Sequence, residues 1–149
     1  ARIKGLGWHV EYLFPGKEIV ELAPIFKKSS VPISIAHFAY QPATNGIDSE
    51  GFKTLLDLVR DGNTWIKISG ANRVSATDLP PYDDVMPMAR ALIEANHDNI
   101  MWGTDWPHPN KYEVNPNDGD LVDAFGEWVT DDTMRQKIMV TNPEKFYAF

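Results

Sequence analysis

The sequence predicts an α/β protein built on a parallel sheet, and three observations support this fold class. Four short runs typical of β-strands alternate along the chain with helical patterns. Polar residues able to do chemistry, His37, Arg73 and Asp105, stand at or just beyond the ends of three of these runs. The length of 149 residues suits one domain with a substantial core. Because parallel α/β folds carry their sites at the carboxyl ends of strands, we expect a site there.

The first strand is predicted over residues 8–14, WHVEYLF, which are rich in aromatic and β-branched residues and are followed by a Pro-Gly turn. A helix is expected from about Glu18 to Lys28. Pro24 lies within this stretch. The first four N–H groups of a helix have no partner, so a helix that begins near Glu21 tolerates the proline.

The second strand is predicted over residues 31–38, VPISIAHF, and the third over residues 64–69, TWIKIS. Asp48 and Ser49 are candidate N-caps of the helix between these strands. The apolar residues of that helix recur at helical spacing, and they are Phe52, Leu55, Leu56 and Val59.

A polar loop and a further helix follow the third strand. The helix is expected over about residues 83–96, with Asp83 and Asp84 at its positive end and with a buried stripe made of Val85, Ala89, Leu92 and Ile93. His97 is interpreted as a cap at the end of this helix. The fourth strand is predicted over residues 99–105, NIMWGTD.

The remainder of the chain is predicted to be helical. Asp118 is expected to cap a helix that carries Leu121, Val122, Phe125, Trp128 and Val129. Another helical segment follows Asp131, and Asn142-Pro143 predicts a last turn through Phe146. The alternation fits two layouts, a doubly wound sandwich or half of a (β/α)8 barrel, whose full form takes about 250 residues. The residues alone leave both layouts open.

Composition excludes several classes of function. The formal net charge is −7 with scattered acidic residues, so we expect no nucleic-acid partner. No apolar run approaches the ~20 residues that a membrane span needs. There is no cysteine, which excludes disulfides, thiolate catalysis and cysteine zinc sites. A reducing cytoplasm fits this composition, and we expect a cytoplasmic protein.

Asp105 is the sharpest catalytic candidate. An apolar run leads directly into it, and Gly103 lets the backbone pass closely, so the carboxylate lies where the strand opens. Its other interpretation is an aspartate that braces the following turn. His37 ends another strand and could orient a water, polarise a carbonyl or bind a metal, or simply bond to a neighbouring backbone carbonyl.

Two further residues could line a pocket. Arg73 follows the third strand, and a guanidinium there could bind a substrate carboxylate through two parallel hydrogen bonds or could lie on the surface. His108 stands between Pro107 and Pro109, which suits a pocket wall or a rigid loop.

Three segments carry a resemblance to a known family: WGTDWPHPN (102–110), IKISGANRVS (66–75) and TNPEKFY (141–147). They resemble the amidohydrolase-related (amidohydrolase 2) family, in particular its 2-pyrone-4,6-dicarboxylate lactonase-like branch. The matching region of that family is the C-terminal half of a TIM (β/α)8 barrel, strands five to eight with their helices. The resemblance therefore favours the half barrel, and residues 1–149 are expected to be one domain that is incomplete at its N-terminus.

The resemblance also implies residue roles and an activity. Asp105 matches the strand-eight aspartate that acts as general base toward water, and His37 matches the active-site histidine of strand six. Arg73 matches an arginine that holds a substrate carboxylate. The implied activity is hydrolysis of a lactone or similar cyclic ester of a carboxylic acid, an anionic small molecule. A metal-dependent decarboxylase and a truncated non-catalytic remnant are the alternatives.

The chain departs from the lactonase pattern at strand six, where Asp-His-Met-Gly-Arg is expected and AHFAYQP is found. Ala36 replaces an acid, and Tyr40 stands where a second substrate arginine is expected. Tyr40 and His108 are accordingly assigned to substrate binding, and the dicarboxylate substrate itself is not carried over. A tyrosine expected near Leu13 has a neighbour in Tyr12.

The family's His-x-His pair belongs to the first barrel strand and does not occur in this sequence. A catalytic zinc site wants about three protein ligands, and only His37 and Asp105 are available. No metal ligand is therefore assigned, although a divalent ion such as zinc or manganese is possible in the complete barrel.

A half barrel would expose two strand edges and an apolar inner face. Three outcomes follow: a fragment of a longer protein, two halves closing as a homo-oligomer, or a sheet rearranged into a sandwich. We expect the fragment, and we expect the isolated chain to be inactive.

Overall fold

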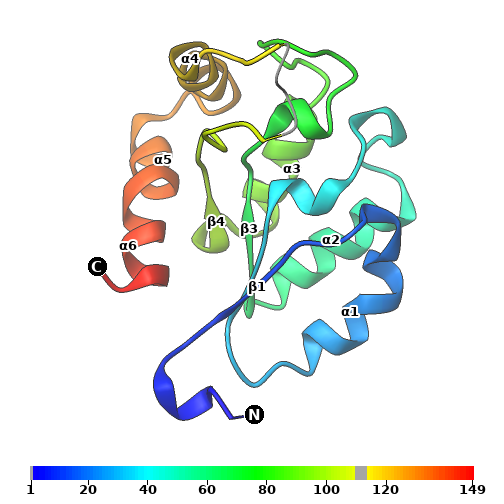
Figure 1. The fold of residues 1–149 in the computed structure, drawn as a ribbon, viewed down its shortest axis with the longest axis vertical. Coiled ribbons are helices and arrows are strands. Elements are labelled where there is room, and N and C mark those ends of the chain that lie inside the picture. Colours follow the sequence, from blue (N-terminus) through cyan, green and yellow to red (C-terminus); the bar gives the residue numbers. More distant parts are fainter. Residues whose placement is uncertain (1, 110–113) are drawn as a thin grey trace.

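The sheet has four parallel strands in the order β1-β2-β3-β4 (Figure 1). This arrangement comes from a computed structural model, which describes residues 2–109 and 114–149. The strands are β1 (Val10–Tyr12), β2 (Ile33–Ile35), β3 (Thr64–Lys67) and β4 (Ile100–Met101). The predicted α/β class with a parallel sheet is confirmed. Neighbouring strands are also consecutive in the chain, without the reversal of order that defines a doubly wound sheet.

Each strand is shorter than the sequence predicts, because the chain leaves the sheet early at both ends. The clearest case follows β2, where residues 37–40 all have φ between 51° and 53°. This backbone cannot continue a strand, and it turns the chain at the point where the predicted site residue His37 stands.

Three helices, α1 (Ile19–Lys27), α2 (Glu50–Arg60) and α3 (Met86–Asn96), pack side by side and cover one face of the sheet (Figure 1). Alternate strand residues point toward them, since side chains along a strand alternate between its two faces. The resulting core is fully buried and includes Ile33, Ile35, Ile66, Ile100, Phe26, Phe52, Leu55, Leu58 and Leu92.

The C-terminal helices lie on the other side of the sheet in Figure 1. They are α5 (Asp132–Gln136), a π-helical turn (Lys137–Thr141) and α6 (Asn142–Tyr147). The Nδ2 of Asn142 donates to the carbonyls of Ile100, at 2.6 Å, and His97, at 2.8 Å. The ring of Phe146 packs on Trp65 of β3, with 4.8 Å between centroids. These contacts hold α6 against β3 and β4.

Helix α4 (Asp118–Trp128) packs beside α3, and short 3-10 turns complete the fold. These turns are η1 (Lys4–Leu6), η2 (Gly16–Glu18), η3 (His37–Tyr40), η4 (Ala43–Asn45), η5 (Ala71–Arg73) and η6 (His97–Asn99). None of the helices formed by the described residues is long and apolar enough to cross a membrane.

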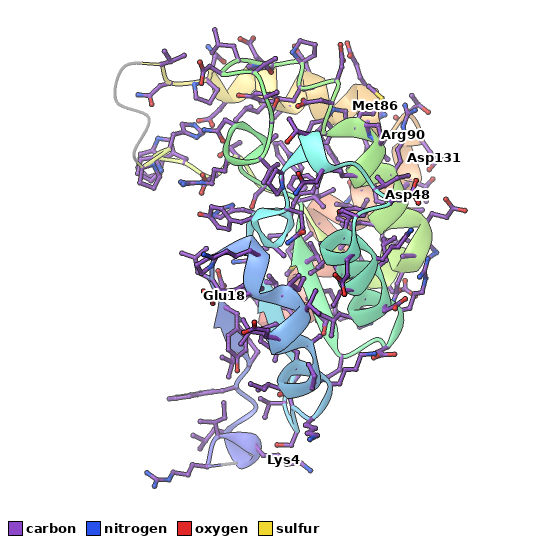
Figure 2. All side chains as sticks on the ribbon, turned by 90° about the vertical axis from the view of Figure 1, so that its right-hand side faces the viewer. Lys4, Glu18, Asp48, Met86, Arg90 and Asp131 are labelled. Carbon is purple, nitrogen blue, oxygen red and sulfur yellow. The ribbon has the colours of Figure 1, made fainter. Side chains whose placement is uncertain are left out.

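One predicted helix is confirmed, and the predicted start of another is wrong (Figure 2). Helix α1 (Ile19–Lys27) confirms the helix predicted from about Glu18 to Lys28, but it does not begin near Glu21, so Pro24 lies inside it. Helix α3 begins at Met86. The Asp84 carboxylate accepts instead from Ser75 Oγ and from the backbone N–H of residue 76, each at 2.7 Å, and so braces the preceding loop.

The helix caps predicted from the sequence are confirmed in part. Of the two candidates, Ser49 caps α2 by accepting from the N–H of Phe52, and Asp48 instead pairs with Lys53. The helical segment predicted after Asp131 is α5, and Asp131 itself caps it by accepting from the N–H of Met134. Asn117, not Asp118, caps α4, because its Oδ1 accepts from the N–H of the second residue of that helix. At α6, the Asn142 side chain bonds across to β4 and η6 instead of capping its own helix.

Four of the five apolar residues that the sequence places on helix α4 are buried, and Val122 is the exception. Phe125 is fully buried and stacks on Trp102, with 5.0 Å between ring centroids, whereas Val122 is 43% exposed.

We expect Phe125→Ala to lower the free energy of unfolding by about 3–5 kcal/mol, because it leaves a cavity in the core. Val122→Ala should stay within about 0.5 kcal/mol of the wild type. Urea denaturation measures both values, and equal losses would contradict this packing.

Candidate active site

The carboxylate of Asp105 lies between two nitrogen donors that come from the ends of other strands. Its Oδ1 is 3.3 Å from His37 Nε2, and its Oδ2 accepts a hydrogen bond from Arg73 Nε at 2.6 Å. Only 11% of the Asp105 side chain is exposed, and His37 and Arg73 are similarly enclosed. The structure thus brings together the three residues that the sequence places at strand ends.

The backbone explains how Asp105 reaches this position. β4 ends at Met101, and the chain turns so that Asp105 has φ 71°, while its carbonyl accepts from the N–H of His108 at 2.8 Å. A positive φ is uncommon for a residue with a side chain, although aspartate tolerates it better than most. Asp105 therefore braces a local turn with its backbone and meets His37 and Arg73 with its side chain.

The imidazole of His37 is held on both sides. Its Nδ1 lies 3.0 Å from Ser69 Oγ, and its Nε2 faces Asp105. A neutral imidazole carries one proton, and a carboxylate oxygen can only accept. A ring proton on Nε2 faces the Asp105 carboxylate, and the Ser69 hydroxyl, which can both donate and accept, suits either tautomer at Nδ1.

Burial lowers the pKa of His37 below the usual value of 6.5. The charge of Asp105 and a hydrogen bond of the ring to the backbone of Ser69 oppose this shift, while the positive charges of Arg73 and Lys67 add to it. The net direction is downward, so His37 is mainly neutral at neutral pH.

Gly70 keeps the centre of the site open. It adopts a left-handed conformation with φ 59° and ψ 46°. A Cβ built on it would lie 2.8 Å from His37 Nδ1 and 3.1 Å from both Asp105 Oδ2 and Arg73 Cδ. Both the backbone and the space therefore require glycine here.

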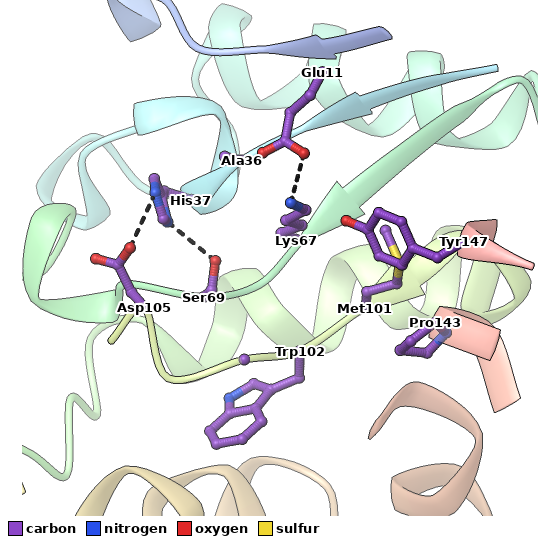
Figure 3. A pocket seen from close by; sticks show the side chains of 11 residues that line it. Glu11, Ala36, His37, Lys67, Ser69, Met101, Trp102, Asp105, Pro143 and Tyr147 are labelled. Carbon is purple, nitrogen blue, oxygen red and sulfur yellow. Dashed lines mark hydrogen bonds and ion pairs between the residues drawn. The ribbon is translucent and has the colours of Figure 1, made fainter. Parts of the chain in front are cut away.

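A cavity of about 370 Å³ opens beside these residues, a volume typical of a small-ligand site. Figure 3 shows His37, Ser69 and Asp105 at one end of it, and Glu11, Lys67 and Tyr147 toward the other. Ala36 also lines the cavity, at the position where the family pattern has an acid. The cavity thus joins the predicted catalytic pair to a second charged group.

That second group is an ion pair between strands β3 and β1. Lys67 Nζ lies 2.7 Å from Glu11 Oε2 and 5.7 Å from the centroid of the Tyr147 ring. Burial lowers the pKa of Lys67, but its interactions with Glu11 and Tyr147 together outweigh burial, and the net pKa is raised above 10.5. Lys67 therefore remains a cation in the cavity.

The sequence analysis missed Ser69, Lys67 and Glu11. A signal was available, because each is a polar or charged residue within or at the end of a predicted apolar strand. Lys67 and Ser69 are two residues apart, so they share one face of the sheet. The polar side chains on one face of the predicted strands therefore indicated which face of the sheet lines the cavity.

Arg73, Tyr40 and His108, the predicted substrate-binding residues, lie near the site but are not among the described side chains that line the cavity. Arg73 donates to Asp105 and, through its NH2 group, to the carbonyl of Pro109 at 3.3 Å. Tyr40 packs edge-on to the His37 ring, with 5.6 Å between centroids. The three assignments stay predictions.

His108 is buried, and its Nε2 is 3.1 Å from Asp118 Oδ1. This contact explains what Asp118 does instead of capping α4. Asn110, the last residue of the segment that carries the family resemblance, lies outside the described residues.

The residues present do not fit a closed metal site. Within 2–109 and 114–149, no three histidine, cysteine, aspartate or glutamate side chains gather as metal ligands. His37 and Asp105 do come together, but one oxygen of Asp105 already receives the Arg73 N–H. A catalytic zinc site uses about three protein ligands.

A family model described as amidohydrolase matches residues 1–149. The chain belongs to the amidohydrolase family. It is 38% identical over 145 residues to a 4-sulfomuconolactone hydrolase of Hydrogenophaga intermedia, covering 96% of this chain and 48% of that protein. It is 36% identical over 154 residues to a 2-pyrone-4,6-dicarboxylate hydrolase of Comamonas testosteroni, covering 98% of this chain and 50% of that protein. The family prediction is confirmed.

The fold is also similar to solved structures. A crystal structure of a probable 2-pyrone-4,6-dicarboxylic acid hydrolase from Acinetobacter baumannii, with citric acid bound, superposes with a TM-score of 0.81 at 27% identity. The match covers 99% of this chain and 55% of that one. The chain spans about half the length of the curated relatives that it matches.

Substitution of the two charged residues beside His37 should shift the pKa of its ring in opposite directions. Asp105→Asn removes a charge that raises the His37 pKa, so the NMR titration midpoint of the His37 ring should fall further below 6.5. Arg73→Met removes a charge that lowers this pKa, so the midpoint should rise. Lys27→Met, which breaks a surface pair with Asp61, should leave it unchanged. Shifts of the same sign in the two site variants would contradict the geometry.

Gly70→Ala should displace the site and Gly7→Ala should not. Both glycines have left-handed backbones, so both variants carry the same kind of strain, about 1–2 kcal/mol. No atom lies within 4 Å of a Cβ built on Gly7, whereas the one on Gly70 meets His37, Arg73 and Asp105. NMR spectra of the His37 ring should therefore change only in Gly70→Ala. An unchanged His37 signal in that variant would refute the close packing.

Proposed function

We propose that the protein carrying this chain hydrolyses a lactone or similar cyclic ester, with Asp105 as the general base. The observation that carries this proposal is the Asp105 carboxylate, nearly buried between His37 Nε2 and Arg73 Nε on the wall of a 370 Å³ cavity. The family relatives named as lactone hydrolases support the class of reaction.

We also propose that the four strands are strands five to eight of a (β/α)8 barrel. Their consecutive parallel order is the order that such a barrel requires. His37, Arg73 and Asp105 follow the carboxyl ends of their strands, where barrel enzymes carry their sites. The relatives are about twice as long as this chain, which leaves room for the other four strands.

In the proposed reaction, Asp105 accepts a proton from water while the water oxygen forms a bond to the lactone carbonyl carbon. The carbonyl electron pair moves to its oxygen and gives a tetrahedral intermediate. When this intermediate collapses, the ring C–O bond breaks, and the leaving oxygen takes the proton back from Asp105. The product is one hydroxy acid, and the carboxylate of Asp105 is regenerated.

The neighbours of Asp105 position it for this role. His37 presents Nε2 to Oδ1 at 3.3 Å, and in the proposed reaction the Ser69 hydroxyl donates to Nδ1, which keeps the ring proton on Nε2. Arg73 orients Oδ2 and supplies a positive charge close to the reacting carbonyl, where it offsets the charge that develops on the oxygen.

Asp105→Asn tests the base directly. In the full protein, we expect turnover of a lactone to fall by about 10²- to 10⁴-fold, because the amide cannot take the proton from water. The circular dichroism spectrum and the unfolding transition should show a folded protein. Asp57→Asn, which alters a surface carboxylate paired with Arg60, is the matched control and should retain turnover.

Lactone turnover by Asp105→Asn at the wild-type rate would contradict the proposed mechanism. Release of carbon dioxide instead of ring opening would favour the decarboxylase alternative.

A further inference from the structure

The cavity has a cationic side chain that the proposed reaction does not use. Lys67 is the single lysine or arginine among the described residues that line the cavity. Arg73, predicted to hold the acid group of a substrate, is committed to Asp105 and to a backbone carbonyl instead. An acidic substrate that entered the cavity would therefore meet the Lys67 ammonium.

The Lys67 ammonium has a hydrogen-bond donor available for a ligand. An ammonium carries three N–H donors; Glu11 accepts from Nζ at 2.7 Å and the Tyr147 side chain interacts with a second donor, which leaves a third for a ligand. The Lys67 side chain is 24% exposed, so it is enclosed but not sealed, and Glu11 is 44% exposed on the edge strand β1. The Tyr147 ring stands 5.7 Å from Nζ and limits the directions from which a ligand can approach.

We infer that Lys67 is the subsite for the acid group of the substrate, an inference that rests on the proposed lactone hydrolysis. Lys67 and Asp105 line the same cavity and come from different segments, β3 and the loop after β4 (Figure 3). In the inferred complex, a small lactone directs its carbonyl to Asp105 and its carboxylate to Lys67. Glu11 balances the lysine charge and opposes a second negative group nearby. The substrate class is therefore a lactone with one acid group at this end.

Binding without turnover tests this subsite. A suitable probe is 3-oxocyclopentane carboxylate, a ring ketone that water cannot open, compared with its uncharged methyl ester. In the full protein, Lys67→Met should weaken binding of the carboxylate by about 10- to 100-fold and change binding of the ester little, because only the carboxylate loses a charged hydrogen bond.

Glu11→Gln is the decisive second variant. Glutamine keeps the shape and an acceptor for Lys67 but removes the negative charge, so the carboxylate probe should bind more tightly than in the wild type. If the Glu11–Lys67 pair only stabilised the fold, both variants would weaken both probes. Lys53→Met, which breaks a pair with Asp48 on the surface, is the matched control and should leave both affinities unchanged.

NMR titration gives the affinities. Opposite effects of Lys67→Met and Glu11→Gln on the carboxylate alone would establish the subsite. Equal effects on both probes, or no carboxylate binding by the wild type, would overturn it. Lactone turnover is assayed separately, so a failure of the proposed reaction is distinguishable from a failure of the subsite.

Discussion

The structure around the cavity depends on one interaction, the placement of the Asp105 carboxylate between His37 and Arg73. A carboxylate that is nearly buried loses much of its hydration, and it requires nearby donors to replace the lost water. Arg73 supplies a charged donor at 2.6 Å, and His37 Nε2 lies 3.3 Å from the other carboxylate oxygen. These contacts hold the ends of three strands in one fixed arrangement.

The backbone adapts to this arrangement in several places. The turn after β2, the left-handed Gly70 after β3 and the positive φ of Asp105 after β4 all redirect the chain where the strands end. Such conformations cost free energy, and they persist where surrounding contacts outweigh that cost. At Gly70 the reason is direct, because a side chain there would occupy the space of His37, Arg73 and Asp105.

Charge at and beside the cavity is organised as two ion pairs, Asp105 with Arg73 and Glu11 with Lys67. Each buried charge therefore has its partner, which is the general condition for keeping ions away from water. The pairs differ in exposure: Asp105 and Arg73 are tightly enclosed, whereas Glu11 is nearly half exposed. The enclosed pair suits fixed geometry for proton transfer, and the open pair suits exchange with a charged ligand.

The sequence by itself determined the α/β class, the central residues of each strand, the Ser49 cap and the helix that follows Asp131, because these features depend on contacts within a few residues. It also placed His37, Arg73 and Asp105 at strand ends. Only the tertiary structure decided which side chains touch. Lys67 and Glu11 are 56 residues apart, and their contact depends on the order and register of the strands. Likewise, the exposure of Val122 and the bond of Asp118 to His108 follow from how α4 packs, which its own helical pattern does not specify.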